Sequence, residues 1–277
     1  MTYLRRKIDA FLEQWKSDSG KKPLIVKGSR QVGKTESIRR FGFANYDSVI
    51  EINFVEEPKY KSIIEDGYSA ASIVRNISLL DPAKRFVEGK TLLFFDELQE
   101  FPEIATALKF FKQDARFDVI CSGSMLGINY QRIESNSVGH KTDFEMRSLD
   151  FEEFLWAKGY DDSIIDEMLT HLIEARPFTN VQHKALMDVF LDYCALGGMP
   201  DVVRSYIDRN TFEGSLQTQR QLVLDYREDI QKYAEGLDKG RILNVFNHIP
   251  AQLAKENKKF QMSKVAKNAR FKDYNGC

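Results

Sequence analysis

Short apolar runs recur along the first 150 residues of the chain, and stretches with apolar residues three or four positions apart separate them. The runs predict buried strands, because a strand that is covered on both faces carries few polar side chains. The spacing between them predicts helices, because positions i, i+3 and i+4 share one helical face. We expect strands at 23–27, 49–54, 91–95, 117–121 and 143–149, and helices at 4–16, 36–41, 57–88 and 104–111.

The alternation of strands and helices predicts an α/β fold, with a parallel sheet sandwiched between layers of helices. The character of the chain changes after about residue 150, where amphipathic helical stretches replace the strand-like runs. One such stretch lies at 186–194 and another at 242–253, and Pro250 inside the second predicts a kink. We therefore expect an α-helical region after the α/β core.

A glycine-rich octet joins the first predicted strand to the helix that follows it. Residues 28–35 read Gly-Ser-Arg-Gln-Val-Gly-Lys-Thr, a complete G-x-x-x-x-G-K-[ST] phosphate-loop pattern. Backbone N–H groups in such a loop form an anion site, to which the next helix adds its positive N-terminal end. The nucleotide-binding residues expected from the loop and the start of its helix are Gly28, Ser29, Arg30, Gln31, Val32, Gly33, Lys34, Thr35 and Glu36.

Two adjacent carboxylates, Asp96 and Glu97, follow the predicted strand at 91–95. Beside a phosphate loop this pattern predicts a Mg²⁺ site, with Asp96 and the Thr35 hydroxyl orienting the ion. Glu97 is then the candidate for polarising the water that attacks the γ-phosphate, and Lys34 for reaching the β- and γ-phosphates. The structural alternative is a solvated acidic turn.

The fourth predicted strand runs into Cys121-Ser122-Gly123-Ser124. A small polar side chain at the tip of the strand beside the acidic pair can contact the γ-phosphate or the attacking water. Ser122 and Ser124 are both candidates for this sensor role, and the sequence does not choose between them. In the alternative interpretation both serines only shape a turn.

Composition narrows the classes of function. The net charge is −1, so no global basic field attracts nucleic acid, and no stretch of 18 apolar residues is present to span a membrane. The three cysteines share no short spacing, which argues against a disulfide framework or a zinc site and favours a reducing cytoplasm. Residues 255–277 carry seven basic and two acidic side chains, so DNA contact is an alternative there to a solvated face.

These motifs together resemble a family of prokaryotic AAA-type ATPases that carry a C-terminal domain of unknown function. Besides the phosphate loop, the resemblance rests on the strings at 94–100, 122–127, 150–155, 197–200 and 249–253, and it covers essentially the whole chain. Family members usually have proline where this chain has Ser137, and they run on well past its last residue. We therefore expect a C-terminally truncated chain.

The resemblance implies a P-loop ATPase core over 1–149, a helical lid over 150–236 and an incomplete winged-helix-like segment over 237–277. It implies ATP as the nucleotide and Mg²⁺ as the cofactor. It also implies that Pro200, in a Gly-x-Pro element of the lid, packs on the base or ribose, although a helix-breaking turn would explain that proline equally. Arg30 would face either a phosphate or a neighbouring subunit of a homo-oligomer, or solvent.

We expect a Mg²⁺-dependent ATPase that acts as a conformational switch or motor. The alternative is a nucleotide-gated binding module with little intrinsic hydrolysis, since the sequence identifies no arginine finger. A small-molecule kinase is less favoured, because adjacent Asp96 and Glu97 suit activation of water and 57–90 shows no clear arginine-rich lid.

Overall fold

The computed structural model describes residues 3–124, 138–233, 238–256, 259–266 and 270–274. Residues 125–127 of the motif at 122–127 lie outside the described residues, and so does Ser137. In the basic C-terminal segment, Lys258 and Lys267 also lie outside them. Contacts divide the chain into two units, Met1–Leu216 and Gln217–Cys277.

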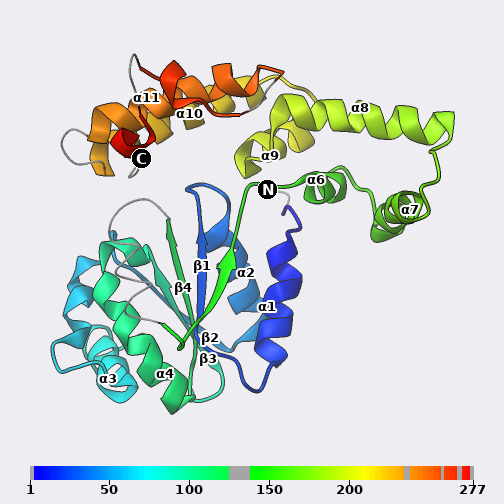
Figure 1. Ribbon diagram of the computed structural model, residues 1–277. Helices are drawn as coiled ribbons and strands as arrows, with labels where there is room; N and C mark the ends of the chain where they lie inside the picture. Colours follow the sequence, from blue (N-terminus) through cyan, green and yellow to red (C-terminus); the bar gives the residue numbers. More distant parts are fainter. Residues whose placement is uncertain (1–2, 125–137, 234–237, 257–258, 267–269, 275–277) are drawn as a thin grey trace. The chain divides into compact units, whose positions relative to one another are not determined.

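A parallel sheet forms the centre of the first unit, which confirms the predicted α/β fold (Figure 1). Its strands lie in the order β2-β3-β4-β1-β5, so β4 separates β1 from β3. The register pairs Gly28 with Ser124 and Phe95 with Cys121, which brings the carboxyl ends of β1, β3 and β4 to one edge of the sheet. The strand bounds are β1 Leu24–Gly28, β2 Ser48–Asn53, β3 Thr91–Asp96, β4 Asp118–Ser124 and β5 Thr142–Glu145.

Helices cover both faces of this sheet, as Figure 1 shows. On one face α1 (Lys7–Ser17) and α2 (Lys34–Asn45) pack on alternate strand residues such as Val26 and Phe94. On the other face α3 (Ala70–Leu80) and α4 (Leu108–Asp114) pack on the intervening residues, with the 3₁₀ segments Pro58–Ile64 and Pro102–Ala107. Alternate residues of a strand point to opposite faces, so β1, β2, β3 and β4 contribute to both cores.

Four helices complete the first unit after the sheet: α6 (Phe151–Ala157), α7 (Asp162–Ile173), α8 (Asn180–Leu196) and α9 (Pro200–Arg209). The helix α10 (Ser215–Tyr233) crosses into the second unit, which also contains α11 (Asp238–Leu253) with Pro250 inside it. Short 3₁₀ segments follow at Met262–Lys264 and Phe271–Tyr274. The region after the core is thus helical as expected, and the lid and winged-helix boundaries stay predictions.

The helix after the phosphate loop is longer than its pattern predicts. The prediction ends this helix at residue 41, with Gly42 as its stop signal, but α2 runs on to Asn45. A Cβ atom at Gly42 would lie 3.0 Å from side-chain atoms of both Leu92 and Val49. The glycine therefore permits close packing of the helix on the sheet instead of stopping the helix.

Three other predicted helices also differ from the structure. The segment expected as a helix at 104–111 is the 3₁₀ segment Pro102–Ala107 followed by α4. The helix expected over 57–88 is broken into the 3₁₀ segment Pro58–Ile64 and α3, and residues 81–88 are not helical. The helix expected from residue 4 begins only at Lys7, because Arg6 is its N-cap and has an extended backbone with φ −129°. This extended entry brings Arg6 into the protein interior, where it is 5% exposed.

Among the described residues, no helix combines the length and apolar character needed to cross a membrane.

Candidate functional site

The loop between β1 and α2 has the backbone of an anion site. Gln31 and Gly33 both have left-handed conformations, with φ 62° and 95°, and Gly33 is the N-cap of α2. Alternation of left- and right-handed residues turns successive N–H groups toward one centre. A Cβ atom at Gly28 would lie 2.0 Å from the carbonyl oxygen of Met146, so only glycine allows the loop to pack against the segment after β5.

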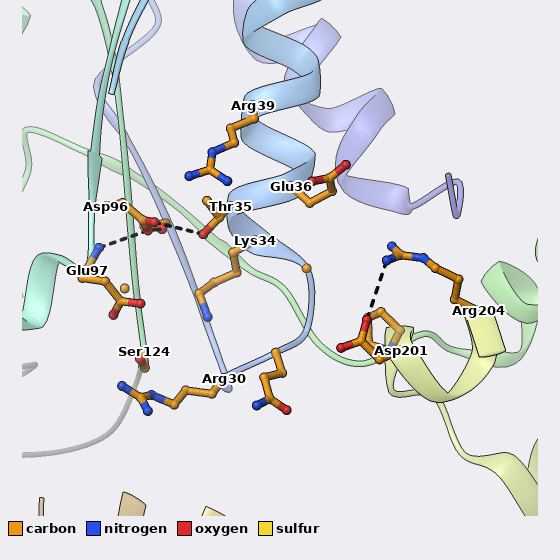
Figure 2. A pocket seen from close by; sticks show the side chains of 15 residues that line it. Arg30, Lys34, Thr35, Glu36, Arg39, Asp96, Glu97, Ser124, Asp201 and Arg204 are labelled. Carbon is orange, nitrogen blue, oxygen red and sulfur yellow. Dashed lines mark hydrogen bonds and ion pairs between the residues drawn. The ribbon is translucent and has the colours of Figure 1, made fainter. Parts of the chain in front are cut away.

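Lys34, the first residue of α2, extends its side chain back under this loop (Figure 2). Its Nζ donates hydrogen bonds to the carbonyl oxygens of Gly28 (3.0 Å) and Ser29 (2.6 Å). Burial lowers the pKa of Lys34 to about 8, against an opposing effect of the Glu97 and Asp96 charges. Burial penalises the charged form of Lys34, so a phosphate that reached its Nζ would offset this penalty.

Asp96, at the end of β3, is the polar centre of the site and is 4% exposed. Its Oδ2 accepts hydrogen bonds from Thr35 Oγ1 (3.1 Å) and Asn53 Nδ2 (3.4 Å). Its Oδ1 accepts from the Glu97 N–H (3.0 Å) and from the Ser122 hydroxyl. Burial raises the pKa of Asp96, and the Ser122 hydrogen bond opposes that shift. The Thr35 hydroxyl and the Asp96 carboxylate are thus brought together, as the sequence predicts.

The oxygen atoms of Thr35 and Asp96 fit the needs of a hard cation. Mg²⁺ prefers oxygen ligands and is held by one or two carboxylates together with substrate phosphates. No group of three or more His, Cys, Asp and Glu residues able to hold a metal ion occurs in the described part of the chain. A cation at this edge of the sheet would therefore depend on phosphate oxygens as well as on the protein.

Glu97 follows Asp96 in a left-handed conformation, with φ 57°. Its carboxylate accepts a hydrogen bond from the Gln99 side-chain amide, whose Oε1 accepts from the Ser124 N–H (3.0 Å). Gln99 is 4% exposed, and a Cβ atom at Gly123 would lie 3.0 Å from its Oε1. Gln99 thus fixes Glu97 relative to β4, a relationship that no pattern in the sequence indicated.

Ser122 and Ser124 both lie within β4 and are buried, so the interpretation that they only shape a turn is wrong. Their environments differ. Ser122 donates to Asp96, whereas the N–H of Ser124 is taken by Gln99. The Ser122 hydroxyl therefore orients the acidic residue of the site, and Ser124 lies at the strand end that pairs with Gly28.

These residues line a cavity of about 500 Å³, within the range of small-molecule sites. Its walls come from the loop, the start of α2, the ends of β3 and β4, and the start of α9 (Figure 2). Four basic residues, Arg30, Lys34, Arg39 and Arg204, and four acidic ones, Glu36, Asp96, Glu97 and Asp201, are among those that line it. Such a mixture suits a polyanion that arrives together with a divalent cation.

Sequence reasoning missed several residues of this cavity. Arg39 donates two hydrogen bonds to Glu51, at 2.7 and 2.6 Å, and Arg204 Nη1 lies 3.7 Å from Asp201 Oδ1. Arg39 comes four residues after Thr35, and Arg204 comes four residues after Pro200. Residues four apart share a helical face, so this spacing was a signal that could have identified both arginines.

Pro200 is the first residue of α9 and lies beside the phosphate loop. Its Cγ would be 3.8 Å from a Cβ atom at Gly33. The preceding Gly198 is held to the core, because the Leu149 N–H donates to its carbonyl (2.7 Å) and a Cβ atom there would lie 2.0 Å from the Leu149 carbonyl oxygen. The base or ribose contact of Pro200 stays a prediction, while its place at the cavity is a fact of the structure.

A family model described as an AAA domain matches residues 20–155, and a model for a domain of unknown function (DUF8612) matches residues 187–277. Both agree with the resemblance drawn from the motifs. A comparison with curated proteins finds no match.

Several solved structures are similar to this chain at low sequence identity. The Caenorhabditis elegans PCH-2 structure is 11% identical over 62% of this chain, with a TM-score of 0.33, and the match spans 47% of that protein's length. The Aeropyrum pernix ORC1 protein, solved with DNA, is 12% identical over 98% of this chain and 75% of its own, with a TM-score of 0.36. The structure of Drosophila ORC bound to DNA is 14% identical over 92% of this chain and 74% of its own, with a TM-score of 0.42.

Proposed function

We propose that this chain, which matches the AAA-domain model over residues 20–155 and a model for a domain of unknown function over residues 187–277, binds ATP with Mg²⁺ and hydrolyses it. The observation that carries the proposal is the meeting of Thr35 Oγ1 and Asp96 Oδ2, 3.1 Å apart, at the mouth of the phosphate loop. Residues 61 positions apart in sequence are thus gathered where a nucleotide-bound Mg²⁺ needs oxygen ligands.

Binding divides among three groups of this chain. The N–H groups of the loop and the start of α2 receive phosphate oxygens, and the Lys34 ammonium leaves its contacts with the Gly28 and Ser29 carbonyls for the β- and γ-phosphates. Thr35 and Asp96 would hold Mg²⁺, which neutralises charge on the phosphates when bound. Ser122 keeps the Asp96 carboxylate in one orientation by donating to its Oδ1.

Hydrolysis is assigned to Glu97. Gln99 donates to one carboxylate oxygen of Glu97, which leaves the other able to accept a proton from the attacking water. Most of the remaining acceleration comes from fixed charges around the γ-phosphate, because phosphoryl transfer needs little covalent help from the protein. The two adjacent carboxylates therefore have different roles: Asp96 would bind the metal, and Glu97 would activate the water.

The conformational switch follows from the origin of the cavity walls. The loop and strand ends belong to the α/β core, whereas Pro200, Asp201 and Arg204 belong to α9 of the helical region. A nucleotide in the cavity would contact both the α/β core and α9. Loss of its γ-phosphate would therefore change the contacts that connect these two parts. Homo-oligomeric assembly and a cytoplasmic location are parts of the proposal that rest on the sequence.

The test is single-turnover hydrolysis by a Glu97→Gln variant, with Glu100→Gln as a matched control that removes a nearby charge outside the cavity. We expect Glu97→Gln to bind ATP and to hydrolyse it about 100-fold more slowly or worse. The control should hydrolyse at the wild-type rate. Wild-type hydrolysis by a Glu97→Gln variant that still binds ATP would show that Glu97 does not activate the water.

The second candidate is a nucleotide-gated module that hydrolyses slowly until a partner completes its site. Two arginines at the cavity, Arg39 and Arg204, are engaged by acidic residues of the same chain, Glu51 and Asp201, which favours an outside source for any arginine finger. Phosphate release measured at increasing protein concentration separates the candidates. A steep rise indicates assembly in trans, and a flat rate near zero indicates the gated module.

Contact with DNA through residues 255–277 is a further part of the proposal. Five basic side chains in the described part of this segment are exposed: Lys255, Lys259, Lys264, Arg270 and Lys272. Binding of a labelled duplex should weaken steeply as salt increases, because phosphate contacts release counterions. Reversal of charge by Lys264→Glu should weaken duplex binding further. Duplex binding that is unaffected by salt and by Lys264→Glu would show that this segment does not bind DNA.

A further inference from the structure

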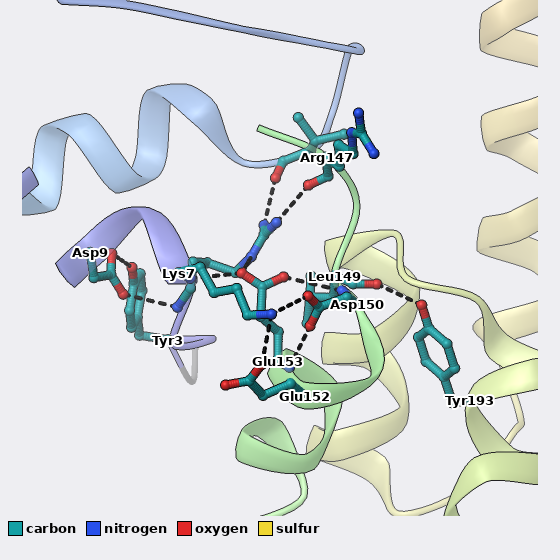
Figure 3. Close-up of polar contacts among 11 residues, drawn as sticks. Tyr3, Lys7, Asp9, Arg147, Leu149, Asp150, Glu152, Glu153 and Tyr193 are labelled. Carbon is teal, nitrogen blue, oxygen red and sulfur yellow. Dashed lines mark hydrogen bonds and ion pairs between the residues drawn. The ribbon is translucent and has the colours of Figure 1, made fainter. Parts of the chain in front are cut away.

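Three consecutive basic residues near the N-terminus, Arg5, Arg6 and Lys7, bind acidic residues of the helical region. Arg5 pairs with Asp162 at 3.0 Å. Lys7 pairs with Asp150 at 2.5 Å and with Glu152 at 2.7 Å, contacts that Figure 3 shows. Arg6 pairs with Glu153 at 3.1 Å. This basic triplet therefore links the start of α1 and the two residues before it to the starts of α6 and α7.

Arg6 differs from its neighbours in burial and in its additional partners. Its side chain is 5% exposed, whereas that of Arg5 is 53% exposed. Its Nη1 donates to the carbonyl oxygen of Val32 (2.7 Å) and its Nη2 to that of Arg147 (2.6 Å). One guanidinium thus joins the phosphate loop, the segment after β5 and, through Glu153, the first helix of the helical region.

Glu153 is also held by backbone N–H groups. Its Oε1 accepts the Lys7 N–H (2.7 Å), and its Oε2 accepts the Asp150 N–H (3.2 Å) as part of the capping box that starts α6. Glu153 is itself 5% exposed. A buried ion pair contributes little net stability compared with apolar side chains of the same volume, so its value lies in the positions that it fixes.

The position fixed by Arg6 is a peptide group of the phosphate loop. Val32 lies between Gln31 and Gly33, which both have left-handed backbones. In a trans peptide the carbonyl of one residue and the N–H of the next point in opposite directions. A guanidinium that holds the Val32 carbonyl therefore fixes the direction of the Gly33 N–H, one of the N–H groups of the anion site.

We propose that Arg6 is a positioning residue for nucleotide binding: it orients the Val32–Gly33 peptide toward the phosphates and, through Glu153, couples that peptide to the start of α6. The inference rests on the proposed nucleotide site and adds to it a physical link between the loop and the helical region. A phosphate that binds the Gly33 N–H therefore also stabilises the Arg6–Glu153 ion pair. By the same coupling, a stable Arg6–Glu153 ion pair strengthens phosphate binding.

The test uses Arg6→Lys, which keeps the charge but cannot donate to the Val32 and Arg147 carbonyls from a planar fork. The matched control is Arg5→Lys, a change in the adjacent residue, whose partner Asp162 lies at the surface. Titration with a fluorescent ATP analogue and Mg²⁺ gives the affinity. We expect Arg6→Lys to bind about 10-fold more weakly, within the range of ordinary coupling between sites, and Arg5→Lys to stay within about 2-fold of wild type.

Hydrogen exchange supplies the readout that a purely structural role would not change. In wild type, nucleotide should slow exchange of the first amides of α6, those of Glu153 and Phe154. In Arg6→Lys, nucleotide at saturating concentration should leave their exchange unchanged. Glu153→Gln removes the charge, and its one side-chain oxygen can keep the capping hydrogen bond from the Asp150 N–H but not also the one from the Lys7 N–H. This variant should also lose the nucleotide effect, and thermal unfolding of each variant reports whether it is folded.

Two results would overturn the inference. Wild-type affinity of folded Arg6→Lys would show that Arg6 does not position the loop. Nucleotide binding by wild type without any change in α6 exchange would show that the loop and the helical region are not coupled. Absence of nucleotide binding by wild type is a different result, since it overturns the proposed function and the inference with it.

Discussion

The side-chain amide of Gln99 donates a hydrogen bond to the carboxylate of Glu97 and accepts one from the backbone of Ser124 (3.0 Å). One buried side chain thus joins the residue after β3 to the last residue of β4. Because β4 lies between β3 and β1, the position of the proposed catalytic carboxylate depends on the strand that also pairs with the phosphate-loop strand. In the proposed function, the nucleotide and the attacking water would therefore both be bound at one edge of the sheet.

Replacement of Gln99 by methionine should lower the rate of hydrolysis about 10-fold, because Glu97 loses the donor that orients it. The affinity for ATP should stay unchanged, since Gln99 is not among the residues that line the cavity in the described structure. The buried Ser124 N–H loses its partner, so the free energy of unfolding should fall by about 1–3 kcal/mol. Single-turnover kinetics and denaturant unfolding measure the two effects, and an unaltered hydrolysis rate would contradict the role given to Gln99.

Gly28→Ala should abolish nucleotide binding, because the new Cβ would lie 2.0 Å from the Met146 carbonyl and the loop must move to avoid it. Gly20→Ala is the matched control, since its Cβ would meet only Asp18, at an ordinary 3.5 Å. We expect the control to bind ATP like wild type. ATP binding by Gly28→Ala at wild-type affinity would mean that the loop does not need its contact with the segment after β5.

The buried Lys34 makes the nucleotide-free protein sensitive to alkaline pH. Its pKa is lowered from 10.5 to about 8, so the unfolded chain binds the proton more tightly than the folded chain does. The stability of the free protein should therefore rise between pH 8 and 10.5, whereas ATP affinity should fall over the same interval because the phosphates need the ammonium. Chemical unfolding and ATP titration across this range measure the two trends.

Lys34→Met provides the control for the stability trend, since methionine has no proton to release. The variant should lack the rise in stability between pH 8 and 10.5 that wild type shows. Parallel stability curves for wild type and Lys34→Met would contradict the lowered pKa and its origin in burial.

The local features of this protein, its phosphate loop and its strands, could be predicted from the sequence. The octet at 28–35 identified the loop, and the apolar runs placed the five strands within a few residues. Local patterns succeed here because a loop conformation and a buried strand are both set by neighbouring residues. Gly42 was misread because a glycine in a helical pattern can mark either the end of the helix or a close contact. Its contacts with Val49 and Leu92, which lie on neighbouring strands, show that it marks a close contact.

The contacts that complete the site depend on residues far apart in the chain. Asn53 and Ser122 reach Asp96 from β2 and β4, and Arg6 reaches the loop from the N-terminus. The different partners of Ser122 and Ser124 were also beyond the sequence, and which of the two serines acts as the sensor stays a prediction. Single-sequence patterns carry no information on such pairings, because they follow from strand order and register.

Calorimetric titration of ATP with Mg²⁺ into wild type and into Lys34→Ala tests the central claim most directly. Lys34 supplies the only ammonium among the residues that line the cavity of the described structure. We predict one saturable site per wild-type chain, and binding by Lys34→Ala at least about 100-fold weaker, as expected when a buried, charge-assisted phosphate contact is lost. Folded wild-type protein that binds no nucleotide, or equal binding by the two proteins, would contradict the account.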